Sequence, residues 1–279
     1  MEMDITKANL LSAFDEPGCP VCHLRQVMEA RHLQTLLADY VNDGKTRMGF
    51  GRSQGLCGRH AWLIQATEQS IWKDGLKTTN FYESLATVVH KAMRRYLASD
   101  DSRRDEARRQ SSRGRYVSRW LTRSDASATL LDRLLADLSP TIECPVCTRV
   151  REREVLDVAK LVQELDDPRF RTAFSSSDGL CLPHLRQALA CAPDPEKGRL
   201  LVEIAENQLD TLLKHLREYQ NKHRWSHHPE LRTAVENGSW IRAVAFFAGE
   251  AIEDSDDALC ALRRQALQDF HARSLEPGP

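Results

Sequence analysis

The sequence predicts an all-α fold made of two duplicated helical units, and three observations lead to this prediction. Leu and Ala recur at helical spacing along the 279 residues, of which 41% are hydrophobic and only 6% aromatic. Alternating runs of β-branched and aromatic residues, the usual sign of strands, are absent. The third observation is an internal repeat.

The repeat is defined by two motifs in a fixed order. Residues 19–22 read Cys-Pro-Val-Cys, and residues 144–147 read Cys-Pro-Val-Cys again, 125 positions later. A second motif, F-x-x-S-x-G-L-C-x-x-H, starts at Phe50 and recurs from Phe174, 124 positions later. Two motifs that recur at nearly the same distance indicate duplication of a whole segment.

Each motif is expected to open a helix. Behind the first Cys pair, Leu24, Met28, Leu36 and Leu37 predict a helix that ends near Asn42-Asp43-Gly44. Apolar positions from Val150 to Leu165 predict its counterpart in the second repeat. Apolar residues after Cys57 and Cys181 predict a further pair of helices, and longer helices are expected at about 78–98 and 197–222.

Two segments separate and follow the repeats. Ser102 to Arg123 contains eight Arg, which is typical of a solvated connector or a frayed helix. A helix at about 126–138 then leads into the second Cys pair. The predicted organisation is therefore a first metal-binding unit (1–101), a basic connector (102–125), a second metal-binding unit (126–250) and an acidic C-terminal helix and tail (251–279).

The Cys and His residues of the two motifs have the spacing of metal ligands. Each repeat supplies C-x2-C and then C-x2-H, and three thiolates with one imidazole form a common tetrahedral shell for zinc. The predicted ligands are Cys19, Cys22, Cys57, His60, Cys144, Cys147, Cys181 and His184. Each repeat would then carry one Cys3His site. An exchange of the Cys pairs between repeats uses the same residue types, so the sequence leaves both pairings open.

Zinc, two ions per chain, is the first choice of metal, because four protein ligands leave no open position for substrate. An iron–sulfur cluster is the alternative. Structural disulfides are not expected in a long chain without an apparent secretion signal, which we expect in the reducing cytoplasm. Cys191 and Cys260 have no counterpart across the repeat, and we expect them to be packing residues.

These motifs resemble a family of bacterial proteins of unknown function in which C-P-x-C and G-x-C-x-x-H occur twice. The segment from Glu236 to Gly249 also resembles the C-terminal part of that family. The resemblance would extend over about residues 5–250. It supports the ligand set, but it implies no activity.

The function classes can be narrowed, although no catalytic residue can be named. P-loop, G-x-S-x-G, dinucleotide-binding and H-E-x-x-H motifs are all absent from the sequence. We therefore expect a metal-binding interaction module whose partner is a protein. The alternative is a thiol-redox or iron–sulfur protein that uses the C-P-V-C pairs as sensor or oxidoreductase. Arg103–Arg123 can contact phosphates, but the net charge of −1 argues against a nucleic-acid partner, and no segment is apolar enough for a membrane span.

Overall fold

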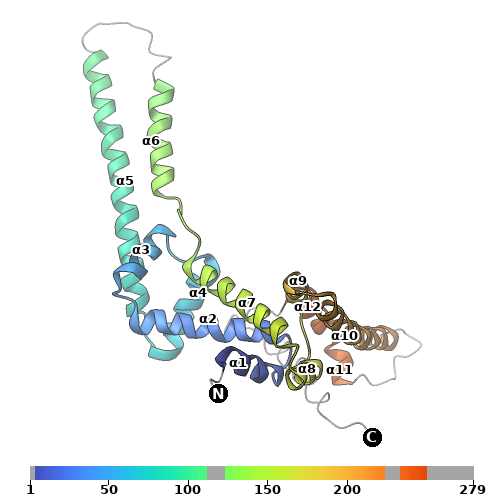
Figure 1. The fold of residues 1–279 in the computed structure, drawn as a ribbon. Helices are drawn as coiled ribbons and strands as arrows, with labels where there is room; N and C mark the ends of the chain where they lie inside the picture. Colours follow the sequence, from blue (N-terminus) through green and yellow to red (C-terminus); the bar gives the residue numbers. More distant parts are fainter. Residues whose placement is uncertain (1–3, 112–122, 224–232, 250–279) are drawn as a thin grey trace. The chain divides into compact units, whose positions relative to one another are not determined.

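The computed structural model describes residues 4–111, 123–223 and 233–249, and all regular elements in these ranges are α-helices, as predicted (Figure 1). They follow one another as α1 (Ile5–Phe14), α2 (Pro20–Asp39), α3 (Gly44–Arg52), α4 (Gly58–Trp72), α5 (Leu76–Ser111), α6 (Arg123–Asp137), α7 (Pro145–Glu164), α8 (Pro168–Ser175), α9 (Leu182–Cys191), α10 (Pro195–Lys222), α11 (Ala234–Asn237) and α12 (Ser239–Ala248).

The chain divides into two compact units that do not coincide with the two repeats. Residues 1–30 and 150–279 form unit 1, and residues 31–149 form unit 2. The division falls within α2 and within the first turns of α7. Each unit is therefore built from parts of both repeats. The domain boundaries expected above follow the sequence repeat and not these compact units. As boundaries between domains they stay a prediction.

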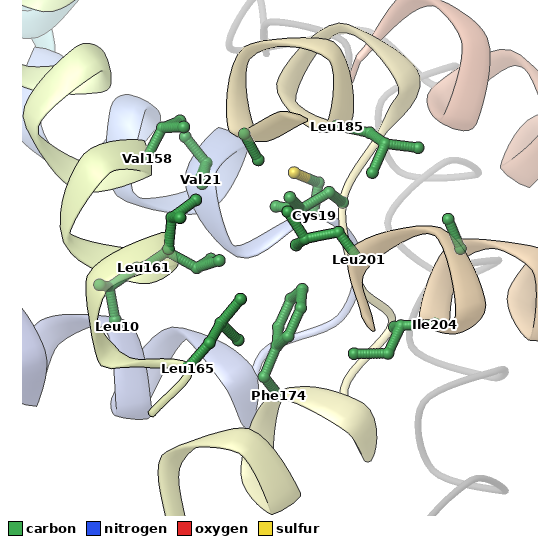
Figure 2. Packing of buried hydrophobic residues seen from close by; sticks show 14 of the residues in the cluster. Leu10, Cys19, Val21, Val158, Leu161, Leu165, Phe174, Leu185, Leu201 and Ile204 are labelled. Atoms are coloured by element: carbon green, nitrogen blue, oxygen red, sulfur yellow. The ribbon is translucent and has the colours of Figure 1, made fainter. Parts of the chain in front are cut away.

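Unit 1 has a core of aliphatic and aromatic side chains from α1, α2 and α7 to α10 (Figure 2). Phe14 packs against the rings of Phe170 and Phe174 at centroid distances of 5.0 and 5.4 Å. Both of these phenylalanines from α8 are 1% exposed. At about 25 cal/mol per Å² of buried apolar surface, such side chains are a main source of the stability of this unit.

At the edge of this core, ion pairs connect the N-terminal part of α1 with the C-terminal part of α7 and the residue before α8. Lys7 contacts both Glu164 and Asp167 at 2.5 and 2.7 Å. Lys160 contacts Asp4 and Glu164, each at 2.6 Å. Hydrogen bonds that Glu164 accepts from Lys160 and Lys7 lower the pKa of Glu164. Because these groups lie near the surface, we expect the network to orient α1 more than to stabilise the fold.

In unit 2, Phe50 of α3 packs against two aromatic side chains of α5. Its ring stacks on Phe81 at 5.0 Å and meets the edge of Tyr82 at 5.2 Å, so α3 is packed against α5. α6 runs beside α5 in the opposite direction (Figure 1). The basic connector expected at 102–125 is partly helical, because α5 extends to Ser111 and α6 begins at Arg123, while residues 112–122 lie outside the described residues.

Replacing Phe174 with Ala should lower the free energy of unfolding by about 3–5 kcal/mol, because it leaves a cavity in a close-packed core. Urea denaturation followed by circular dichroism measures this change. Phe247→Ala is the matched control, since Phe247 is 61% exposed and its truncation should change stability by less than about 0.5 kcal/mol. Equal effects of the two substitutions would contradict this account of the core.

Candidate metal centres

Two groups of Cys and His side chains could each hold a metal ion, and each lies within one compact unit. Unit 1 contains Cys19, Cys22, Cys181 and His184, and unit 2 contains Cys57, His60, Cys144 and Cys147. In each group, one potential ligand atom from every residue lies within 4.8 Å of the others. Of the two pairings that the sequence left open, the structure has the exchanged one. The C-x2-C of each repeat meets the C-x2-H of the other.

Helix N-termini position all eight side chains. The carbonyl oxygens of Cys19, Cys57, Cys144 and Cys181 accept the first backbone hydrogen bond of α2, α4, α7 and α9, so these residues are the N-caps. The other four ligand candidates occupy the third helical position. In an N-terminal turn, the side chains of the N-cap and the third residue lie side by side, as in a capping box. This geometry explains why both motifs have two residues between their members.

The segment before each C-x2-H forms a turn that leads into the helix beginning at the cysteine. Ser53 Oγ donates to backbone carbonyl oxygens in its turn, including that of Gly55 at 2.7 Å. Gly55 and Gly179 have φ angles of +89° and +71°, a left-handed conformation that favours glycine. The chain can therefore reverse between the buried Phe of the motif and the Cys that begins the next helix.

In the unit 1 cluster the imidazole of His184 points one nitrogen at the sulfur atoms. Its Nδ1 lies 3.1 Å from Cys181 Sγ, 3.4 Å from Cys19 Sγ and 3.5 Å from Cys22 Sγ. The sulfur atoms of Cys22 and Cys181 are 3.8 Å apart. All four residues are buried.

The other ring nitrogen of His184 is held by a carboxylate. Its Nε2 lies 3.0 Å from Glu154 Oε1, which also accepts a hydrogen bond from Gln187 Nε2 at 3.1 Å. Metal-binding histidines commonly have such a partner, because it fixes the ring and selects the tautomer. This contact therefore leaves Nδ1 as the ligand atom.

The unit 2 cluster has the same donor set but is more accessible. His60 Nδ1 lies 3.1, 3.3 and 3.6 Å from the sulfur atoms of Cys57, Cys147 and Cys144. Cys57 Sγ and Cys147 Sγ are 3.6 Å apart. Cys57 and Cys147 are only partly buried, whereas every ligand candidate in unit 1 is buried.

In unit 2, neighbouring thiols cannot all ionise easily, and their pKa values are shifted in opposite directions. Burial raises the pKa of Cys144, but hydrogen bonds from His60 and from backbone N–H groups lower it to about 6. Burial and the neighbouring Cys57 raise the pKa of Cys147 to about 12. One sulfur therefore ionises easily while its neighbour retains a proton. A bound cation would relieve this competition and allow every thiol to ionise.

In unit 1, too, one thiol has a lowered pKa and a neighbouring thiol has a raised pKa. Hydrogen bonds with Cys181 and Cys19 lower the pKa of Cys22 strongly, and burial raises the pKa of Cys19. Burial opposes protonation of His184, yet its contacts with Cys181, Cys22 and Glu154 raise its pKa to about 11. These shifts favour a thiolate at Cys22 beside an imidazolium at His184.

The structure also shows what the sequence interpretation missed. Glu154 of α7 contacts His184, and Gln187 of α9 contacts Glu154, but no local sequence pattern marks either residue. Cys191 is exposed, so its expected packing role is wrong, and Cys260 lies outside the described residues. The side chains of Arg103–Arg123 also lie outside the description, and that possible phosphate-binding segment stays a prediction. None of the described helices is long and apolar enough to cross a membrane.

Comparison with known proteins places the sequence in a family but gives no activity. The chain is 22% identical over 241 residues to a protein of Caldicellulosiruptor sp. (strain Rt8B.4) described as "Uncharacterized 23.9 kDa protein in xynA 3'region", covering 86% of this chain and 99% of the relative. No solved structure matches. A family of unknown function, DUF6062, matches residues 1–228, so the segment from Glu236 to Gly249 lies beyond the matched part. The chain belongs to this family of unknown function, in agreement with the resemblance seen in its duplicated motifs.

Proposed function

We propose that the protein binds two zinc ions, one in each cluster, and that these ions hold the helices as a scaffold for a protein partner. The observation that carries this proposal is the convergence of two separate Cys3His sets on points within the described residues. The ligands of one ion are Cys19, Cys22, Cys181 and His184, and those of the other are Cys57, His60, Cys144 and Cys147.

The distances within the clusters support a single tetrahedral ion. At a Zn–S bond of about 2.3 Å, two sulfur ligands of a tetrahedron lie about 3.8 Å apart. The two sulfur–sulfur distances are 3.8 Å in unit 1 and 3.6 Å in unit 2. In an iron–sulfur cluster the protein ligands are divided among two or more iron atoms, and ligands of different irons lie farther apart than the 4.8 Å within which all four donor atoms lie here. The observed spacing therefore favours zinc over the iron–sulfur alternative.

A structural role follows from the closed ligand set. Four protein ligands leave no open position for water or substrate, and burial of the unit 1 cluster limits access further. Metal binding can contribute on the order of 10 kcal/mol to the folding of a small domain. In this protein the ion would join helices that are distant in the sequence.

An exposed apolar face supports a protein as the partner. Trp240, Val244 and Phe247 of α12 are 48%, 60% and 61% exposed, and their spacing places them on one side of the helix. Contiguous exposed apolar side chains are typical of interaction surfaces. We place this function in the cytoplasm, where thiols remain reduced.

A redox function of the thiols is the second candidate. Cys57 and Cys147 are partly exposed, and their sulfur atoms are close. A two-electron oxidant such as hydrogen peroxide, itself reduced to water, would convert this pair of thiols into a disulfide between the repeats and release the ion. A sensor would use such chemistry reversibly, whereas a scaffold would keep its metal under the same conditions.

Element analysis of the anaerobically purified protein should give two zinc ions per chain and no visible absorption. Cys57→Ser and Cys181→Ser should each lower the zinc content by about one ion and reduce the helical circular dichroism signal, because each removes a ligand of one site. Cys191→Ser is the matched control, since Cys191 is exposed and outside both clusters. Iron with sulfide, or metal-free protein with reactive thiols, would reject the structural zinc sites.

The two ions should leave the protein at different rates. Transfer to a coloured chelator should be biphasic, with the faster phase from unit 2, because a chelator reaches partly exposed thiolates more easily than buried ones. Cys57→Ser should abolish the fast phase and Cys181→Ser the slow phase, which stopped-flow absorbance measures. A single phase that neither substitution changes would contradict the assignment of the phases.

A further inference from the structure

In unit 2, the antiparallel helices α5 and α6 carry more apolar side chains than their mutual contact buries (Figure 1). Ala92 and Tyr96 are one turn apart on α5, and Leu130 and Leu134 are one turn apart on α6. All four are buried or partly buried, as expected for the positions at which the two helices meet. Apolar residues beside these positions are nevertheless exposed on both helices.

Four of these exposed residues form a continuous face. Met93 and Leu97 of α5 are 44% and 58% exposed, and Leu131 and Leu135 of α6 are 46% and 54% exposed. Each directly follows one of the contact positions. Because the helices are antiparallel, the residue after a contact position lies on the same side of the pair in both helices. These four side chains together are called the α5–α6 face.

An ion pair marks the opposite side of the same two helices. Arg95 Nη2 lies 3.7 Å from Asp137 Oδ2. Each of these residues follows a contact position by three, which places it on the side away from the α5–α6 face. The ion pair also sets the register of the helices, because it brings Leu97 and Leu135, each two residues away from it, to the same level.

An apolar stripe that extends beyond one neighbouring helix is typical of four-helix bundles, in which each helix contacts two others. Unit 2 supplies two of the four helices. A second copy of the chain supplies a matching antiparallel pair with the same face, and a twofold axis is the commonest relation between identical chains.

The charges beside the α5–α6 face fit a second copy. Arg94 is three residues before Leu97, Asp132 is three residues before Leu135, and both charged side chains are exposed. A twofold axis parallel to the helices places α5 of one copy opposite α6 of the other. Each edge of the bundle then carries one arginine and one aspartate, so the charges attract across the contact.

The size of the face predicts a weak contact. Over the 15 residues of α6, two helices side by side are about 22 Å long and about 20 Å wide, which is roughly 450 Å². Two copies would bury about 900 Å² in total, which is the size of weak, reversible interfaces.

We propose that the α5–α6 face binds the same face of a second copy, so that two chains form a four-helix bundle as a reversible dimer. The contact is separate from the exposed face of α12, which belongs to unit 1. It does not depend on zinc in either cluster.

Sedimentation velocity on the full-length protein as purified, from about 1 to 200 µM, measures the dimer, for which we expect a dissociation constant on the order of 10 µM. Leu97→Glu and Leu135→Glu should each weaken the dimer at least about tenfold, because each places a charge in the apolar contact twice, once from each copy. The double variant Leu97→Lys/Leu135→Glu should dimerise more strongly than Leu135→Glu alone, since the two new charges are opposite and face each other across the contact.

Two control variants locate the contact. Val88→Glu adds the same charge to α5 at a residue that is 52% exposed and lies on the side of the ion pair. Phe247→Ala shortens an exposed side chain of α12 in unit 1. Both should leave the dissociation constant unchanged. Circular dichroism and zinc content of every variant separate a loss of dimer from a loss of fold or metal.

Four outcomes would overturn the proposal. The first is a protein that stays monomeric at about 200 µM, where an interface of this size should be occupied. The second is a dimer that neither glutamate substitution on the α5–α6 face weakens, and the third is one that Val88→Glu or Phe247→Ala weakens as much. The fourth is a loss of helical signal in monomeric Leu97→Glu, which would show that another part of the same chain covers the face. The zinc proposal stands or falls separately, on metal content.

Discussion

The convergence of two helix N-termini on one group of four donor atoms is the constraint on which the structure depends. In each unit, one of these helices comes from each repeat, and each contributes its N-cap and third residue. The partial positive charge of the helix ends favours thiolate, but several thiolates in one place repel one another. A bound cation would favour the thiolates and also offset their mutual repulsion, so the helix geometry is consistent with a metal site.

Because the motifs are exchanged between the repeats, α2 and α7 do more than carry the cysteines. Each begins at a cluster in one compact unit and continues into the other unit. The two compact units therefore do not coincide with the two duplicated segments. Glu154 illustrates the result, since it lies on the helix that begins at the unit 2 cluster but contacts His184 in unit 1.

Much of the fold and of the candidate site could be predicted from the sequence, because both depend on local patterns. Apolar periodicity indicated the long helices, and the repeated motifs indicated all the Cys and His residues that come together. The short helix α3 was missed, since Gly44, Gly49 and Gly51 weaken its helical pattern. The pairing of the motifs and the contact of Glu154 arise from contacts between distant segments, which no local pattern encodes.

Because each ligand set combines both repeats, the two clusters can be completed only in a fixed order during synthesis. Neither repeat alone contains both halves of a cluster, so the first Cys pair must remain without its partners while the ribosome adds the second repeat. Cys22 and His184 are separated by 162 positions, which corresponds to a delay on the order of ten seconds at ordinary elongation rates. The cluster of unit 2 is complete once Cys147 has emerged, before the cluster of unit 1. Cys19 and Cys22 thus lack the other half of their cluster for that interval, and the earliest cysteines of the chain are the last to be enclosed.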